Sequence, residues 1–307
     1  MSLLNHMRAF IRVAELGSFT RAADDLGLPK ASASTAVQQL ENTLGVRLLH
    51  RTTRSVVLTQ DGQAFYERCK DTLADMDELQ TMFQAPTSDA LAGRVRLDMS
   101  TVMARQAVLP RLPELLARHP RLAIEISSTE RRVDVVGEGF DCVLRAGRVN
   151  DPGLVVKPIC ALPMVNCASP GYLGRYGTPL SLQDLAQHQL VHYAATLGAK
   201  CPGFEYMVDD TDHALPMGGP VTVNNAEAYQ AACLAGLGLI QAPLAGVREL
   251  LAQGALVAVL PQFSARPMPL SLVYANRRNQ SARVRVVMDW LTVVVAEHVQ
   301  AAPAILG

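Results

Sequence analysis

The sequence predicts an α/β protein with three parts: a small helical unit closed by a hairpin, a long linker helix, and two lobes of alternating strands and helices. Two short amphipathic helices flank Gly27, and a proline-free helical pattern runs from Asp61 to Phe83. From Gly93 onward, strand patterns alternate with helical ones. At 307 residues, the chain is long enough for two or three domains with cores of their own.

The helical unit begins with an amphipathic helix expected over Leu3–Leu16. Two shorter helices follow, over Thr20–Leu26 and Lys30–Leu44, and Ser18 or Thr20 can cap the first of them. The second turns one apolar side inward, at Ala33, Val37, Leu40 and Leu44. Two small helices joined at a glycine turn indicate a helix-turn-helix whose second helix recognises DNA.

The outer side of that second helix favours an anionic partner. Hydroxyls, amides and one cation cover it, and no carboxylate occurs between Lys30 and Gln39. A hairpin over Val46–Leu58 then carries cations and hydroxyls at its tip, His50–Ser55, which is typical of a wing. The alternative is a merely solvated face, although such faces are usually rich in Glu and Lys pairs. The DNA-binding candidates are Ser18, Thr20, Lys30, Ala31, Ser32, Ser34, Thr35, Gln38, Arg51, Thr53 and Arg54.

Charge is distributed unevenly along a chain that is neutral overall. Residues 1–60 hold seven Lys and Arg against four Asp and Glu, whereas the whole chain holds 28 of each class. A positive N-terminal unit on a neutral protein is a modest electrostatic signature of nucleic-acid binding.

The helix over Asp61–Phe83 carries a narrow apolar stripe with heptad spacing. A helix of this length with one narrow stripe is hard to stabilise alone, so a second copy of the chain is the expected partner. The alternative is that the stripe packs on the same chain. The residues proposed for dimerisation are Phe65, Cys69, Met76, Leu79 and Phe83, and Ala85–Ser88 marks a hinge. The expected domains are therefore 1–60, a linker at 61–86, and 87–307.

The remaining chain predicts two α/β lobes. Strands are expected near Arg94–Met99, Leu122–Ser127 and Phe140–Arg145, separated by helices over Ala104–Arg118 and Arg131–Glu138. The chain then crosses to a second lobe, about 163–265, and returns, so that lobe one comprises about 90–162 and 266–300. Two lobes joined by two crossovers are typical of the periplasmic-binding-protein type of fold.

Polar residues follow the strands of both lobes, where open α/β sheets bind ligands. A small anion or carboxylic acid would suit them. Ser and Thr at such places are also ordinary helix caps, and Arg145 could instead pair with Asp141 or Asp134. The candidate ligand residues are Ser100, Thr101, Ser128, Thr129, Arg145, Asn225 and Phe204, the last in a loop expected to cover the site.

Fixed spacings in the first sixty residues resemble the LysR-type transcriptional regulators. The family pattern MxxFxxVAExGSFTxAA stands at Met7–Ala23, QLExxLGVxLxxR at Gln39–Arg51, and xLTxxG closes the wing at Leu58–Gly62. The chain departs from the family at Pro29–Ser32 and Thr35, so the operator sequence of other members does not transfer. The resemblance implies a homodimer or homotetramer on double-stranded DNA, a small-molecule effector at the positions named above, and RNA polymerase as a further candidate partner.

Other functional classes find little support. An enzyme is not expected, because nucleophile elbow, Walker A loop and paired catalytic carboxylates are missing from the sequence. No metal site or cofactor is expected, since the six cysteines form no CxxC and His188 and His192 fall on a strand pattern. A solute-binding transport protein would carry a signal peptide. A cytoplasmic protein without a membrane segment is therefore predicted.

Overall fold

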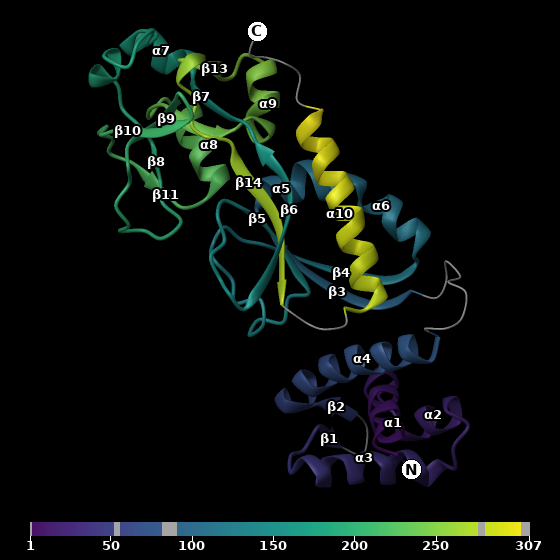
Figure 1. Ribbon diagram of the computed structural model, residues 1–307. Helices are drawn as coiled ribbons and strands as arrows, with labels where there is room; N and C mark the ends of the chain where they lie inside the picture. The colour runs from purple at the N-terminus through teal and green to yellow at the C-terminus, as the bar shows by residue number, and fades with distance from the viewer. Residues whose placement is uncertain (1, 52–55, 82–90, 276–279, 302–307) are drawn as a thin grey trace. The chain divides into compact units, whose positions relative to one another are not determined.

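The computed structural model describes residues 2–51, 56–81, 91–275 and 280–301. The chain forms two compact units, Met1–Arg94 and Val95–Gly307 (Figure 1). None of the helices in the described part of the chain combines the length and apolarity that a membrane span requires.

The N-terminal unit is three helices, a two-stranded hairpin and a long helix. Glycines in the left-handed conformation end two of the helices, Gly17 after α1 and Gly45 after α3. Ser18 caps α2 by accepting from the Arg21 N–H at 3.4 Å. The elements are α1 (Leu3–Leu16), α2 (Phe19–Asp25), α3 (Lys30–Leu44), β1 (Leu49–Arg51), β2 (Val56–Leu58) and α4 (Gln60–Thr81).

The core of this unit lies between α1, α3 and the hairpin. Phe10 is fully buried at its centre, and Val37 and Leu40 of α3 contribute to it. Ala33 is buried as expected, but Leu44 is 40% exposed because α3 ends there, beyond the core. The face that α3 buries is therefore set by residues 33–40.

The hairpin is held by α3 and by the start of α4. Buried Glu41 of α3 accepts with Oε1 from the N–H groups of Leu48 and Leu49, at 2.9 and 3.1 Å. Thr59 donates its hydroxyl to the Arg47 carbonyl and accepts from the Gly62 N–H, at 2.7 and 2.8 Å. A Cβ at Gly62 would lie 1.9 Å from the Leu48 carbonyl oxygen, so only glycine fits there.

Helix α4 uses its first half to cover the core of its own unit. Cys69 is 1% exposed, and the Phe65 ring lies 5.7 Å from the Phe10 ring, centroid to centroid. The dimer prediction is therefore wrong for Cys69, and half-buried Phe65 packs on its own chain, which is the alternative weighed above. Met76 is half-buried, whereas the Leu79 side chain and Phe83 lie outside the described residues.

Lobe one is a five-stranded sheet in the order β4-β3-β5-β14-β6. β3 and β5 are parallel, and the returning strand β14 is antiparallel to both of its neighbours. Its strands are β3 (Ala92–Met99), β4 (Arg121–Ser128), β5 (Cys142–Ala146), β6 (Leu154–Leu162) and β14 (Met268–Ala275). Its helical segments are α5 (Thr101–Met103), the π-helical η2 (Ala104–Val108), α6 (Leu109–Arg118) and α10 (Ala282–Gln300).

Lobe two contains a three-stranded sheet, β12-β7-β13, and two pairs of short strands. Its strands are β7 (Met164–Ala168), β8 (His192–Tyr193), β9 (Phe204–Val208), β10 (Thr211–Leu215), β11 (Thr222–Val223), β12 (Ile240–Pro243) and β13 (Val257–Ala258). Its helices are α7 (Pro170–Tyr176), η3 (Asp184–Gln187), α8 (Ala226–Leu234), α9 (Leu244–Ala252) and η4 (Pro261–Phe263).

Two expectations in the lobes are wrong. Residues 131–138 form no helix: 131–134 are irregular and hydrogen-bonded turns follow over 135–139, because carboxylates of the segment cap its own N–H groups. Phe204 is not in a covering loop: it begins β9, pairs with Leu215 of β10, and is fully buried in the core of lobe two.

Candidate functional site

Helix α3 presents an uncharged polar stripe to solvent. Ala31, Thr35, Gln38 and Asn42 are exposed, at intervals that keep them on one helix face. The Thr35 hydroxyl donates to the Ala31 carbonyl at 3.1 Å. Ser32 and Ser34 are half-buried beside this stripe. Asn42 was not predicted from the sequence, although the same spacing extends to it.

Other predicted DNA contacts surround this stripe. Ser18 is half-buried as the cap of α2, and Thr20 is exposed on that helix. Lys30 begins α3 and Arg51 ends β1, but their side chains are outside what the structure describes, as are Thr53 and Arg54 altogether.

Two carboxylates of this unit are engaged inside it. Glu41 caps the hairpin, as described above. Asp25 accepts two hydrogen bonds from the Arg12 guanidinium, at 2.6 and 2.7 Å, and these bonds lower the pKa of the Asp25 carboxyl. Both of these acids therefore have partners within the unit.

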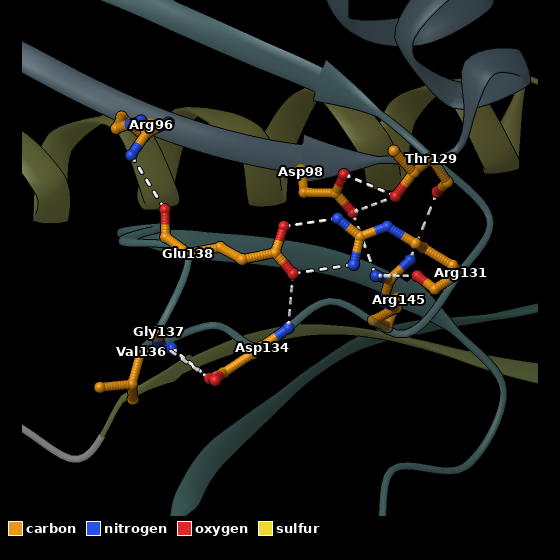
Figure 2. A network of polar contacts seen from close by, with 9 residues as sticks. All are labelled: Arg96, Asp98, Thr129, Arg131, Asp134, Val136, Gly137, Glu138 and Arg145. Atoms are coloured by element: carbon orange, nitrogen blue, oxygen red, sulfur yellow. Dashed lines mark hydrogen bonds and ion pairs between the residues drawn. The ribbon is translucent and has the colours of Figure 1, made fainter. Parts of the chain in front are cut away.

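In lobe one, a buried ion pair joins three neighbouring strands. Asp98 of β3 is fully buried, and its Oδ1 lies 3.1 Å from Nη2 of Arg145 on β5 (Figure 2). Thr129, directly after β4, donates its hydroxyl to Asp98 at 3.0 Å. The structure thus brings the predicted residues Thr129 and Arg145 together through Asp98. Arg145 pairs with neither of the two aspartates considered above.

The Arg145 guanidinium also fixes the segment that follows β4. It donates to the Arg131 carbonyl at 2.6 Å and to the Thr129 carbonyl at 3.5 Å. Burial raises the pKa of the Asp98 carboxyl, while the hydroxyls of Ser127 and Thr129 and the Arg145 charge oppose that rise. Arg145 is therefore a positioning group whose charge is balanced by Asp98.

Carboxylates hold the turn after Thr129 in place (Figure 2). Arg131 donates to both oxygens of Glu138, at 2.8 and 2.5 Å, and Glu138 also accepts from the Asp134 N–H. These bonds lower the pKa of the Glu138 carboxyl to about 2. Asp134 in turn accepts from the N–H groups of Val136 and Gly137.

Two of the other strand-end residues act as helix caps in the structure. Ser100 accepts from the Met103 N–H at 3.3 Å, and Thr101 is the first residue of α5. In lobe two, Asn225 accepts with Oδ1 from the N–H groups of Glu227 and Ala228, at 2.9 and 3.1 Å. Ser128 is exposed at the end of β4.

Glu130 directly follows Thr129 in lobe one and is half-buried. Its Oε1 atom is buried and has no hydrogen-bond partner among the residues that the structure describes. Burial raises the pKa of Glu130, and burial together with the Glu130 charge raises the pKa of Tyr193 to about 12.

Two contacts join the lobes. Arg105 of η2 lies 3.3 Å from Glu227 of α8, and both side chains are exposed. The Gln106 amide donates to the Gly246 carbonyl of α9 at 3.2 Å. The strand ends of lobe one thus lie next to the first turn of α8.

Comparison with known proteins decides the family. The model "Bacterial regulatory helix-turn-helix protein, lysR family" matches residues 4–63, and "LysR substrate binding domain" matches residues 88–295. The chain belongs to the LysR family of transcriptional regulators. It is therefore a DNA-binding regulator with an effector-binding domain.

LysR-type relatives match along nearly the whole chain. The HTH-type regulator YhjC of Escherichia coli is 46% identical over 97% of this chain and 99% of its own. An HTH-type transcriptional repressor of Pseudomonas aeruginosa is 35% identical, over 97% of this chain and 94% of its own. The structure of CrgA from Neisseria meningitidis has a TM-score of 0.58 at 28% identity, covering 94% of this chain and 97% of CrgA. The full-length structure of AphB from Vibrio cholerae has a TM-score of 0.54 at 26% identity, covering 95% of this chain and 98% of AphB.

In this LysR-type chain, Asp98, Glu130 and Tyr193 were not predicted from the sequence. The alternation of apolar and polar residues along β3 and β8 does not distinguish Asp98 or Tyr193 from other residues of those strands.

A surface hollow of about 420 Å³ is lined by none of the predicted site residues. It is lined by Arg132, Val133, Asp134, Val135, Val136, Asp151, Gly153 and Leu154.

Proposed function

We propose that this LysR-type regulator reads its operator with the exposed face of α3. The observation that carries the proposal is the solvent-facing stripe of Ala31, Thr35 and Gln38, from which the Glu41 carboxylate is turned away. Short hydroxyls and amides on a helix can bond base edges in the major groove. Lys30, Ser32 and Ser34 would flank this contact, Ser18 and Thr20 would bind phosphate, and Arg51, Thr53 and Arg54 would bind phosphate or the minor groove.

Salt dependence tests the phosphate contacts. In fluorescence polarisation with promoter DNA, Lys30→Ala and Arg54→Ala should each weaken binding and reduce the slope of log K against log salt by roughly one. Lys70→Ala is the matched control, since it removes the same charge from α4, where Lys70 lies over the Tyr66 ring. Slopes and affinities equal to wild type in both variants would refute the assignment.

We further propose that the effector is a small carboxylic acid or another small anion, bound between the two lobes. The residues around it would be Ser100, Thr101, Ser128, Thr129, Arg145 and Asn225. The start of α8 at Asn225 supports this chemistry, because a helix N-terminus favours negative charge. Phe204 is withdrawn from the set, since it is buried in the core.

A thermal-shift screen tests the effector class. Small carboxylic acids should raise the melting temperature of the full chain, and their primary amides should not. Thr101→Val should reduce the shift, whereas Thr292→Val, on α10, should not. This part of the proposal would be contradicted if amides raised the melting temperature as much as their acids do. It would also be contradicted if acids raised the melting temperature of Thr101→Val as much as that of wild type.

We also propose that the second half of α4 and the residues after it form the dimer contact, through Met76, Leu79 and Phe83, and that dimers assemble further into tetramers. Light scattering should show that Leu79→Glu shifts the protein toward the monomer, while Gln63→Glu leaves its oligomeric state unchanged.

In addition, we propose a contact with RNA polymerase at the promoter. Purified polymerase should then alter the footprint of the regulator on its operator.

A further inference from the structure

A buried histidine in lobe two is bonded to a buried tyrosine. His188 follows η3 and is 5% exposed, and its Nδ1 atom lies 3.2 Å from the Tyr172 hydroxyl oxygen of α7. The two rings are tilted against each other, with centroids 5.7 Å apart, and Tyr172 is itself 1% exposed. A histidine at such a place takes up a proton only at a cost, because burial disfavours the charged ring.

Hydrogen bonds decide which partner of this pair is the donor. The Tyr172 oxygen accepts from the Gln189 N–H at 2.7 Å. Among the residues that the structure describes, Nδ1 of His188 is the acceptor within reach of the hydroxyl hydrogen. The network therefore assigns a neutral His188 whose own hydrogen is on Nε2. Burial raises the pKa of Tyr172, so the hydroxyl keeps its hydrogen.

A proton on His188 is incompatible with this arrangement. Both nitrogens of an imidazolium are donors, so Nδ1 can no longer accept. The Tyr172 hydroxyl would then hold a buried hydrogen without an acceptor, which is costly. Burial lowers the pKa of His188, and the Asp184 carboxylate of η3 opposes this effect. Asp184 is itself engaged, since it accepts from the N–H groups of Leu180 and Ser181 at 2.9 Å each.

The pair is connected to the strands of lobe two through Gln189. Tyr172 binds the N–H of Gln189, and the Gln189 carbonyl accepts from the Leu239 N–H at 2.8 Å, directly before β12. Helix α9 begins directly after β12, and its Gly246 carbonyl accepts from Gln106 of lobe one. The pair therefore lies at one end of a chain of contacts that leads to the boundary between the lobes.

We propose that His188 and Tyr172 form an acid-sensitive lock in lobe two, closed while His188 is neutral and opened when Nδ1 takes up a proton. The lock would act whichever effector the domain binds. Because the folded pKa of His188 lies below its ordinary value of 6.5, the stability that the neutral pair contributes is complete above pH 6.5. It is lost as the pH falls from 6.5 toward the folded pKa. Mild acidity should therefore loosen α7 and the segment before β8, while lobe one stays folded.

Thermal unfolding of the full chain at about pH 7.5 and about pH 5.5 tests the lock. The melting temperature of wild type should fall on acidification. In His188→Gln, which cannot take up a proton, the fall should be smaller by roughly 2 to 4 °C. Part of the fall should remain in that variant, since burial also lowers the pKa of His298 on α10.

His213→Gln is the matched control for this comparison. His213 of β10 also stacks on a tyrosine of lobe two, with its ring centroid 5.3 Å from that of Tyr206, but it is exposed. Because an exposed ring takes up its proton in water, the acid-induced fall of this variant should equal that of wild type.

Two measurements do not require His188→Gln to fold. In an NMR titration of wild type, the His188 ring should give a midpoint below 6.5. Tyr172→Phe should move that midpoint toward 6.5, because the hydroxyl that binds the neutral ring is gone. Hydrogen exchange of the Gln189 amide, corrected for its intrinsic rate, should show lost protection in acid, whereas the Leu291 amide of α10 should stay protected.

The lock is overturned if the His188 ring titrates at or above 6.5, or if the Gln189 amide keeps its protection in acid. An acid-induced fall of His188→Gln equal to that of wild type also overturns it. Should His188→Gln not fold, the titration and the hydrogen exchange of wild type decide. The operator and effector contacts proposed above are tested with other variants, so failure of the lock leaves them unaffected.

Discussion

Glu138 is a surface carboxylate whose hydrogen bonds decide its titration. Arg131 and the Asp134 N–H bind its ionised form and lower its pKa to about 2, from an ordinary value of 4.5. Because the folded pKa lies below the unfolded one, the stability it contributes is present above the unfolded value and is lost as the pH falls toward 2. Carbon-13 NMR of its carboxyl, assigned with Glu138→Gln, should show titration near pH 2. Titration near 4.5 would mean that the turn is open in solution.

Asp98 should be the most sensitive single residue of lobe one. Asp98→Ala leaves the Arg145 guanidinium, 16% exposed, without its ion partner, which should cost about 3 to 5 kcal/mol of unfolding free energy. Denaturant unfolding measures the loss. Removing both charges, in Asp98→Asn with Arg145→Gln, should cost less than the two single losses combined. Strict additivity of the two would show that the pair is not coupled.

The sequence predicted which residues lie near the strand ends of lobe one, but not which side chains they contact. Thr129 and Arg145 were predicted at the site because they end or follow strands, and both contact Asp98. Asp98 itself lies on the middle strand of the three, and only the order β4-β3-β5 brings it between them. Local spacing carries no information about that order.

The junction between the β1–β2 hairpin and α4 is closely packed at Gly62. Gly62→Ala would place a Cβ 1.9 Å from the Leu48 carbonyl oxygen, so backbone must move, and we expect a loss of roughly 1 to 3 kcal/mol. Thermal unfolding of the full chain measures it. Gly171→Ala, at a position with no atom within 4 Å of the new Cβ, is the control. Equal stability of the two variants would contradict the close packing described.

The helices were predicted best where caps define their ends. Bounds of α1 and α3 agree with expectation, because Gly17 and Gly45 end them in the left-handed conformation. The hairpin of β9 and β10 was missed, since its outer residues are polar and it lies between loop-like segments. The apolar stripe of α4 was identified, but a second copy of the chain was expected to cover it. The core of the same unit covers Cys69 instead, which was the stated alternative.

The whole molecule combines a DNA-binding unit with an effector domain whose lobes are joined by contacts of η2 with α8 and α9. Family membership supports both functions, and the structure describes each unit by itself. The fold class was predictable because the sequence shows the hydrophobic periodicities of strands and helices and the fixed spacings of the family motifs. The contacts between the lobes were not predictable, since they join Arg105 and Gln106 to residues 227 and 246, far along the chain.

Measurements of operator binding test whether the exposed stripe of α3 contacts base edges. Genomic fragments selected by the purified chain would define the operator, and fluorescence polarisation would then compare Gln38→Ala with Gln63→Ala, a glutamine exposed on α4. We predict that Gln38→Ala weakens operator binding roughly 5- to 150-fold and leaves binding to random DNA unchanged, while Gln63→Ala matches wild type. Equal operator affinity of Gln38→Ala and wild type would contradict base reading by α3.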